Sequence, residues 1–84
     1  MSLDLIGFLK DGKYRLKVLE ELEKRPLLPS ELAEILDINR ASVSRVLKDL
    51  REKELVNFTS NNTRTILYSI SETGKKIIGI INDR

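Results

Sequence analysis

The side chains best suited to chemistry are basic residues on one side of the segment that follows Asn39. If this segment is a helix, with about 100° between successive residues, Arg45 and Lys48 lie opposite its apolar residues Val43 and Leu47. A guanidinium group can donate two parallel hydrogen bonds to O6 and N7 of guanine, and an ammonium group binds phosphate. The spacing therefore indicates a surface that fits a nucleic acid.

Small and polar residues occupy the start of the same segment, where Ala41 and Ser44 would let a helix approach the edges of bases closely. Arg51 is better placed for phosphates, and Arg64 falls near a predicted hairpin tip, from which it would reach the backbone or the minor groove. We predict that DNA is contacted by Arg40, Ala41, Ser42, Ser44, Arg45, Lys48, Arg51 and Arg64.

The opposing interpretation is that these basic residues form an ordinary solvated helix face. Asp49 and Glu52 lie in the same segment and dilute its positive charge. The formal net charge of the whole chain is only +2, but it is unevenly placed: residues 1–39 hold six bases and eight acids, and residues 40–84 hold nine bases and five acids. This asymmetry favours the second half as the part that meets a polyanion.

The rest of the composition excludes most enzymatic chemistry. The 84 residues include no Cys and no His, which excludes disulfides, the usual zinc and copper sites and catalysis by Ser/His or Cys/His pairs. We therefore expect no enzyme, no metal and no cofactor. No apolar run approaches the roughly 20 residues that cross a bilayer, and no signal peptide is visible, so we expect a cytoplasmic protein without a membrane partner. The absence of Gln beside abundant Ile, Lys, Glu and Arg leans toward a thermophilic, archaeal source.

The elements that position the basic segment follow from periodicity and from helix-ending residues. Pro26 ends one helix, while Asn39 and Ser71 are good N-caps for the two helices that follow them. After residue 54 the apolar period changes from 3.6 to 2, which predicts a hairpin. We expect one domain over residues 1–84, mainly α with a small β-wing: an apolar N-terminal extension (1–11), a helix (12–25), a helix-turn-helix (29–36 and 40–54), a wing hairpin (55–70) and a C-terminal helix (72–82).

The apolar residues of these elements predict the core. Leu27 and Leu28 are expected to form a brief extended link, a strand of a single bridge. On the helix 29–36 the expected buried face consists of Leu32, Ile35 and Leu36, and the core side of the hairpin consists of Val56, Phe58, Tyr68 and Ile70.

These motifs in this order resemble the winged helix-turn-helix regulators of archaea and bacteria, in particular the MarR-like and ArsR-like groups. The resemblance rests on the stretch from Pro29–Ala33 through Leu55–Val56 and on Tyr68–Lys75, and it covers roughly residues 12–81. It implies a three-helix bundle with a β-hairpin and a C-terminal helix. It also implies sequence-specific binding of double-stranded DNA by a transcriptional regulator, with the helix 40–54 in the major groove and the loop 60–64 on the neighbouring backbone or minor groove.

The chain departs from the family pattern in three respects. Asp37 stands in the turn where the family often has Gly, the wing carries one base and no Gly, and the metal ligands of metal-sensing relatives are absent, so metal sensing is not implied. The alternative function is a winged-helix protein–protein adapter within a transcription or replication complex, which the acids and the sparse wing favour. The bases at Arg40, Arg45 and Lys48 argue against it.

Two apolar segments suggest a homodimer, since one recognition helix rarely makes enough contacts for a specific site. We expect an interface made by Leu5, Ile6, Phe8 and Leu9 together with Ile77, Ile78 and Ile81. The alternative is that both segments only cover the protomer's own small core.

Overall fold

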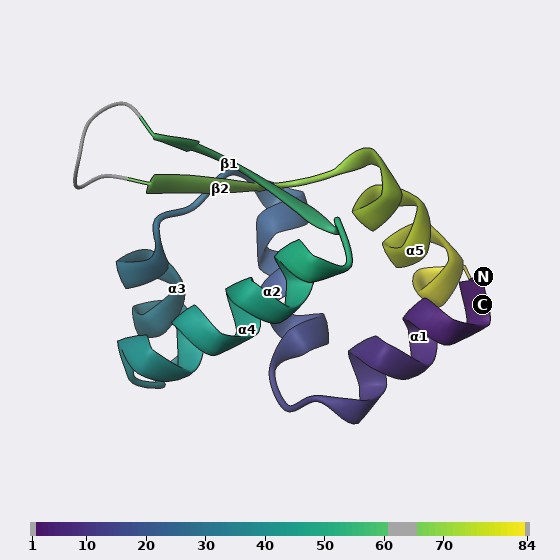
Figure 1. Cartoon of the computed structure of the whole chain (residues 1–84), viewed down its shortest axis with the longest axis horizontal. Coiled ribbons are helices and arrows are strands. Elements are labelled where there is room, and N and C mark those ends of the chain that lie inside the picture. Colours follow the sequence, from purple (N-terminus) through teal and green to yellow (C-terminus); the bar gives the residue numbers. More distant parts are fainter. Residues whose placement is uncertain (1, 61–65, 84) are drawn as a thin grey trace.

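The computed structural model describes residues 2–60 and 66–83 of the chain. In the described part, five helices pack together and one antiparallel hairpin lies along one side of them, above α3 and α4 in Figure 1. The elements are α1 (Ser2–Asp11), α2 (Arg15–Lys24), α3 (Pro29–Leu36), α4 (Arg40–Glu52), β1 (Val56–Ser60), β2 (Ile66–Ile70) and α5 (Glu72–Asn82). The fold is therefore mainly α with a small β-wing, as predicted. Across the described ranges no helix is both long and apolar enough to span a bilayer.

Two helices are shorter than the sequence predicts. Helix α2 begins at Arg15 instead of Gly12, because Tyr14 has φ 72° and ψ −8°, a left-handed conformation that cannot continue a helix. Helix α4 ends at Glu52 instead of Glu54, because Glu54 is also left-handed, with φ 59°. Neither left-handed position is itself a glycine, so the residue type gives no sign of either interruption.

The turn between α3 and α4 is built by three consecutive residues. Asp37 is left-handed, with φ 57° and ψ 48°, and ends α3 at the position where glycine would be least strained. The backbone N–H of Ile38 then donates to the Ala33 oxygen at 3.1 Å, and the Ile38 side chain packs on the core. Asn39 Oδ1 accepts a hydrogen bond from the Ser42 N–H at 2.8 Å, which confirms the predicted N-cap of α4.

The expectation that Ile35 is buried is wrong. The buried face of α3 runs through Leu32 and Ala33 towards Leu36, and Ile35 lies at the edge of this arc, where its side chain is exposed. Ala33 is small enough to stay buried where α4 crosses α3.

The hairpin pairs Val56 with Ile70 and Phe58 with Tyr68. On the other side of β2, Leu27 and Tyr68 exchange two backbone hydrogen bonds of 2.9 Å each, which confirms the predicted single bridge. Val56, Tyr68 and Ile70 are buried as expected, but Phe58 is 46% exposed. Alternation places Phe58 on the core side of its strand, but β1 is the outer strand, since β2 lies between it and Leu27.

The core is continuous from the helix-turn-helix to the terminal helices. Helix α1 packs against α2 and α5, and both termini lie at that end of the molecule (Figure 1). Ser71 caps α5, since its Oγ accepts from the Gly74 N–H at 3.0 Å and donates to the Glu54 oxygen at 2.8 Å. This bond fixes the start of α5 to the end of the α4–β1 connection.

Candidate nucleic-acid interface

Helix α4 is held in one rotation about its axis by its buried face. Val43, Val46, Leu47 and Leu50 pack in the core, so the opposite side of the helix must face solvent. The structure exposes Arg40, Ala41, Ser44, Arg45, Lys48 and Arg51, and Ser42 is half-buried. All seven predicted contact residues of this helix therefore retain surface, and their role in binding DNA stays a prediction.

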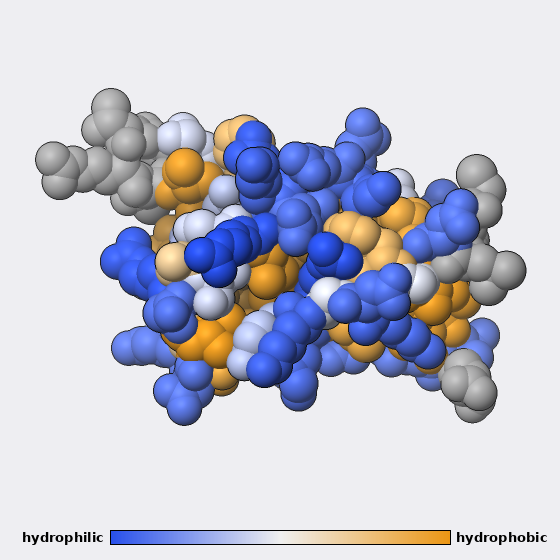
Figure 2. Space-filling view, turned by 60° about the horizontal axis from the view of Figure 1, so that its bottom comes forward, coloured by the Kyte–Doolittle hydropathy of each residue, from blue (hydrophilic) through white to orange (hydrophobic). Residues whose placement is uncertain are grey.

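The surface around α4 is mostly hydrophilic. Figure 2 turns the lower part of Figure 1 toward the viewer, which includes α4 and the turn between α1 and α2. Charged and polar residues predominate on this face, and apolar residues occur in separate patches among them. Such a face suits a solvated, charged partner better than a large apolar one.

Arg51 lies on the flank of α4 that faces the hairpin. Its guanidinium carbon is 4.2 Å from the centroid of the Phe58 ring, a cation–π geometry. The Phe58 ring is in turn 6.0 Å from that of Tyr68, at an interplanar angle of 39°. The exposed aromatic ring thus serves as a platform that restricts where Arg51 points. The sequence did not indicate this role, because alternation assigned Phe58 to the core.

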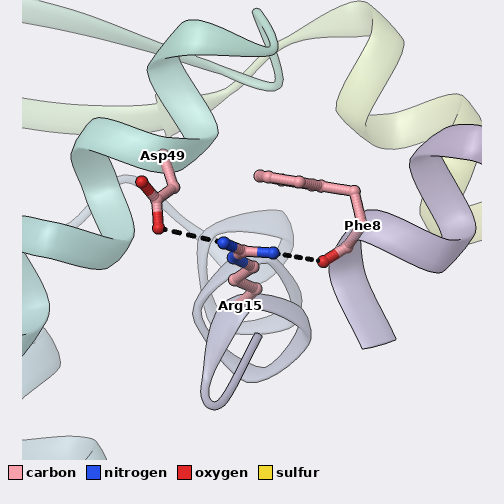
Figure 3. A network of polar contacts seen from close by, with 3 residues as sticks. All are labelled: Phe8, Arg15 and Asp49. Carbon is pink, nitrogen blue, oxygen red and sulfur yellow. Dashed lines mark hydrogen bonds and ion pairs between the residues drawn. The ribbon is translucent and has the colours of Figure 1, made fainter. Parts of the chain in front are cut away.

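Asp49 lies on the opposite flank, and its charge is compensated. Arg15 Nη2 is 3.2 Å from Asp49 Oδ2, and Arg15 Nη1 donates to the Phe8 backbone oxygen at 2.7 Å (Figure 3). The same guanidinium lies 4.0 Å from the centroid of the Phe8 ring. Arg15 thereby links α1, α2 and α4, and Asp49 dilutes the positive face less than its sequence position suggests. No local sequence signal reveals this pair, since 34 positions separate its members.

The structure does not bring every predicted site residue to α4. Arg64 and the tip residues 61–63 lie outside the described residues, where β1 ends at Ser60 and β2 begins at Ile66. Glu52 is exposed on the outward side of α4 and remains an acid on that face.

Three residues of the expected dimer interface belong to the protomer's interior. Leu9, Ile77 and Ile78 are buried, because α1 and α5 pack on each other and on α2, and this leaves these side chains no surface for a partner. The expectation for these three residues is therefore corrected. Leu5, Ile6, Phe8 and Ile81 are only partly buried, so their role at an interface stays a prediction.

The acidic residues do not assemble into a recognisable metal site. Over residues 2–60 and 66–83, no group of three or more potential His, Cys, Asp or Glu ligands comes together. The hollows beside α4 are shallow grooves, and one of them is lined by Lys48, Arg51 and Glu52.

Known proteins share both the sequence pattern and the fold. The family model described as "HVO_A0261 N-terminal domain" matches residues 3–80. None of the curated proteins matches this chain.

Solved structures of regulators superpose on the chain. ZitR of Lactococcus lactis in complex with DNA has a TM-score of 0.69 and 29% identity, covering 75% of this chain and 44% of its own; ZitR is described as a zinc-responsive MarR family member. A MarR variant of E. coli complexed with operator DNA has a TM-score of 0.77 and 23% identity, covering 84% and 53%. Reduced HlyU of Vibrio cholerae has a TM-score of 0.77 and 23% identity, covering 99% and 90%.

The resemblance to winged-helix regulators of the MarR type is thus confirmed for the fold. This chain spans about half the length of the ZitR chain and of the streptococcal repressor AdcR, of which it covers 49% and 53%.

Proposed function

This chain belongs to the HVO_A0261 N-terminal domain family, and we propose that it binds double-stranded DNA sequence-specifically as a transcriptional regulator. Helix α4 enters the major groove, where Arg45 reads a guanine and Lys48 and Arg51 bind phosphates. The hairpin tip, with Arg64, reaches the adjacent backbone or minor groove. The similar ZitR and MarR structures that contain DNA support this proposal.

The observation that carries the proposal is the rotation of α4. Its four buried residues direct Arg45 and Lys48 outward, next to the small side chains of Ala41 and Ser44. Small residues at the start of a helix and bases along it match the depth of a major groove and the position of its phosphates. An adapter surface would instead need an apolar outward face, and α4 has none.

The test is a titration of labelled duplexes at several salt concentrations, using a duplex selected from random fragments by the protein itself. Affinity is expected to fall steeply as salt rises, because bound phosphates release counterions. Arg45→Ala is expected to weaken the selected duplex about 10- to 100-fold and a scrambled duplex much less. Lys48→Ala is expected to weaken both duplexes alike. Lys76→Ala is the matched control. It removes an exposed basic residue of α5, which lies at the other end of the molecule from the start of α4 (Figure 1), and it should change the affinity for neither duplex.

Binding that does not depend on salt, or that survives both Arg45→Ala and Lys48→Ala, contradicts the proposed interface. The adapter function would then be the better explanation.

The proposal includes a homodimer, because two linked recognition helices can read two half-sites. Leu5, Ile6, Phe8 and Ile81 retain surface at the end formed by α1 and α5, where Ile80 is 46% exposed. Sedimentation equilibrium at micromolar concentration is expected to show a species of twice 9.6 kDa, and Ile80→Lys should shift it toward the monomer. A 9.6 kDa species alone would contradict the dimer.

No catalytic step, cofactor or metal enters this proposal. A chain without His or Cys lacks the usual nucleophile–base pairs and zinc ligands, and DNA binding needs neither. Its place of action would be the cytoplasm, where the DNA of a bacterium or archaeon lies.

A further inference from the structure

The turn between α1 and α2 borders the recognition helix. Gly12, Lys13 and Tyr14 line a shallow groove together with Ser42 and Arg45 of α4. The sequence placed these three residues inside a helix and gave them no role in binding. In the structure they line the same groove as Arg45, the residue proposed to bind a guanine.

Contacts hold this turn in an uncommon conformation. Tyr14 has φ 72°, a region that bulky residues rarely adopt, and its oxygen accepts from the Val18 N–H at 2.9 Å. Arg15, the next residue, is attached to Asp49 of α4 and to the Phe8 oxygen of α1 (Figure 3). The turn therefore has a defined position relative to α4.

Lys13 is the basic residue of this turn that is exposed to solvent. Its side chain is exposed, its Nζ lies 5.5 Å from the centroid of the Tyr14 ring, and it makes no ion pair with any other described residue. Asp49, the acid of α4 that lines the same groove, is paired with Arg15. An ammonium group with no acidic partner beside Arg45 is available to a phosphate.

Lys13 and Arg51 lie on opposite flanks of α4. Arg51 contacts Phe58 of the hairpin, whereas the other flank, with Ser42 and Asp49, faces the turn. The two phosphate backbones run along the two sides of a helix inserted in a major groove about 12 Å wide. A basic residue on each flank of α4 would therefore contact the phosphates of a different DNA strand.

We propose that the turn formed by residues 12–14 is a further DNA-contacting element, in which Lys13 binds a backbone phosphate on the strand opposite the one contacted by Arg51. This inference rests on the proposed function, since it requires α4 to enter a major groove. The turn gives the domain a third DNA-contacting element besides the recognition helix and the wing. Its positive charge adds to that of the wing, which has only one basic residue.

The most direct test uses the absence of cysteine from the chain. Lys13→Cys creates a unique thiol to which an iron–EDTA cleavage reagent can be attached, and the labelled protein is bound to the selected duplex. We expect backbone cuts at the edge of the site on one strand. Lys76→Cys, labelled in the same way on α5, is expected to give none. If the Lys13→Cys conjugate cuts no more than the Lys76→Cys conjugate while both proteins bind, the inference is overturned.

A charge test separates this inference from the proposed function. Lys13→Gln is expected to weaken every duplex about fivefold and to lower the salt slope by about one, with an unchanged melting temperature, while Lys76→Gln changes nothing. If Lys13→Gln binds like the unaltered protein but Arg45→Ala weakens binding, Lys13 is no contact and the proposed function stands. If the unaltered protein binds no duplex, both are overturned.

Discussion

The two ends of the molecule use their helices in opposite ways. At one end α4 buries a single apolar stripe and keeps Arg45 and Lys48 in solvent. At the other end α1 and α5 pack on each other, bury Leu9 and Ile78, and still leave Ile80 46% exposed (Figure 1). The first end presents charge on a rigid helix, and the second presents apolar surface that the protomer has only partly covered.

This difference shows what a helical period can and cannot predict. For α4 the period separates inside from outside, because one stripe meets one core. For α5 the apolar stripe is wider. Its packing on α1 and α2 determines which apolar residues are buried within the protomer and which stay exposed for a partner. The predictions below test this division, beginning with the largest expected effect.

Ile78→Ala is expected to lower the free energy of unfolding by about 2–5 kcal/mol, because Ile78 is fully buried and the truncation leaves a cavity. Ile80→Ala on the same helix is the control and should cost less than about 1 kcal/mol. Urea unfolding at two protein concentrations measures both. If Ile78 contacted a partner subunit instead, the loss of unfolding free energy caused by Ile78→Ala would vary with protein concentration. The assignment of Ile78 to the core and Ile80 to the surface would then be wrong.

Gly74→Ala is expected to cost about 1–3 kcal/mol, because an added Cβ would lie 2.5 Å from the Leu55 oxygen and 2.7 Å from Ile70 Cγ1. Gly79→Ala provides the contrast, since an added Cβ there meets nothing within 4 Å and the position is exposed within α5. That substitution should stabilise the protein by about 0.5–1 kcal/mol through helix propensity. Thermal unfolding of the pair gives the sign of each effect, and equal signs would contradict the close approach at Gly74.

Asn39→Ala removes the N-cap of α4 and is expected to cost about 1 kcal/mol. Asn39→Asp keeps an acceptor for the Ser42 N–H and should lie within a few tenths of a kcal/mol of the unaltered protein, by about the spread among good caps. Chemical denaturation compares the two variants. An equal loss in both would mean that the cap contributes nothing measurable to the helix-turn-helix end.

Asp49→Asn has the smallest expected effect on stability, below about 1 kcal/mol, because the side chains of Asp49 and Arg15 are 39% and 22% exposed. Removing a negative charge beside α4 should at the same time tighten DNA binding slightly at low salt. Unfolding and duplex titration of one preparation measure both. A loss above about 2 kcal/mol would mean that Arg15 determines the packing of α1 far more than its exposure suggests.

Much of the fold was predictable because its signals are local. Asn39 and Ser71 carry side chains that cap helices, and Pro26 prevents α2 from continuing past its C-cap Arg25. Tyr14 and Glu54 escaped prediction, because both are left-handed although their residue types do not favour that conformation. Phe58 escaped prediction because alternation tells which side of a strand a residue faces but not whether the strand is the outer one, as β1 is.

The candidate site was predictable to the same degree. Periodicity alone placed Arg45 and Lys48 outside, and the structure exposes both. It could not associate Arg15 with Asp49, or Lys13 with Arg45, because each pair joins segments about 30 residues apart whose meeting depends on how α2 crosses α4.

The central claim is that DNA meets the end of the molecule formed by α3, α4 and the hairpin, and not the end formed by α1 and α5. Backbone amide shifts of the isotope-labelled protein, followed as the selected duplex is added, test it residue by residue. We predict that the largest changes fall on residues 39–48, with smaller ones on residues 12–14 and 57–60. Changes confined to residues 74–82, with α4 unaffected, would contradict this account.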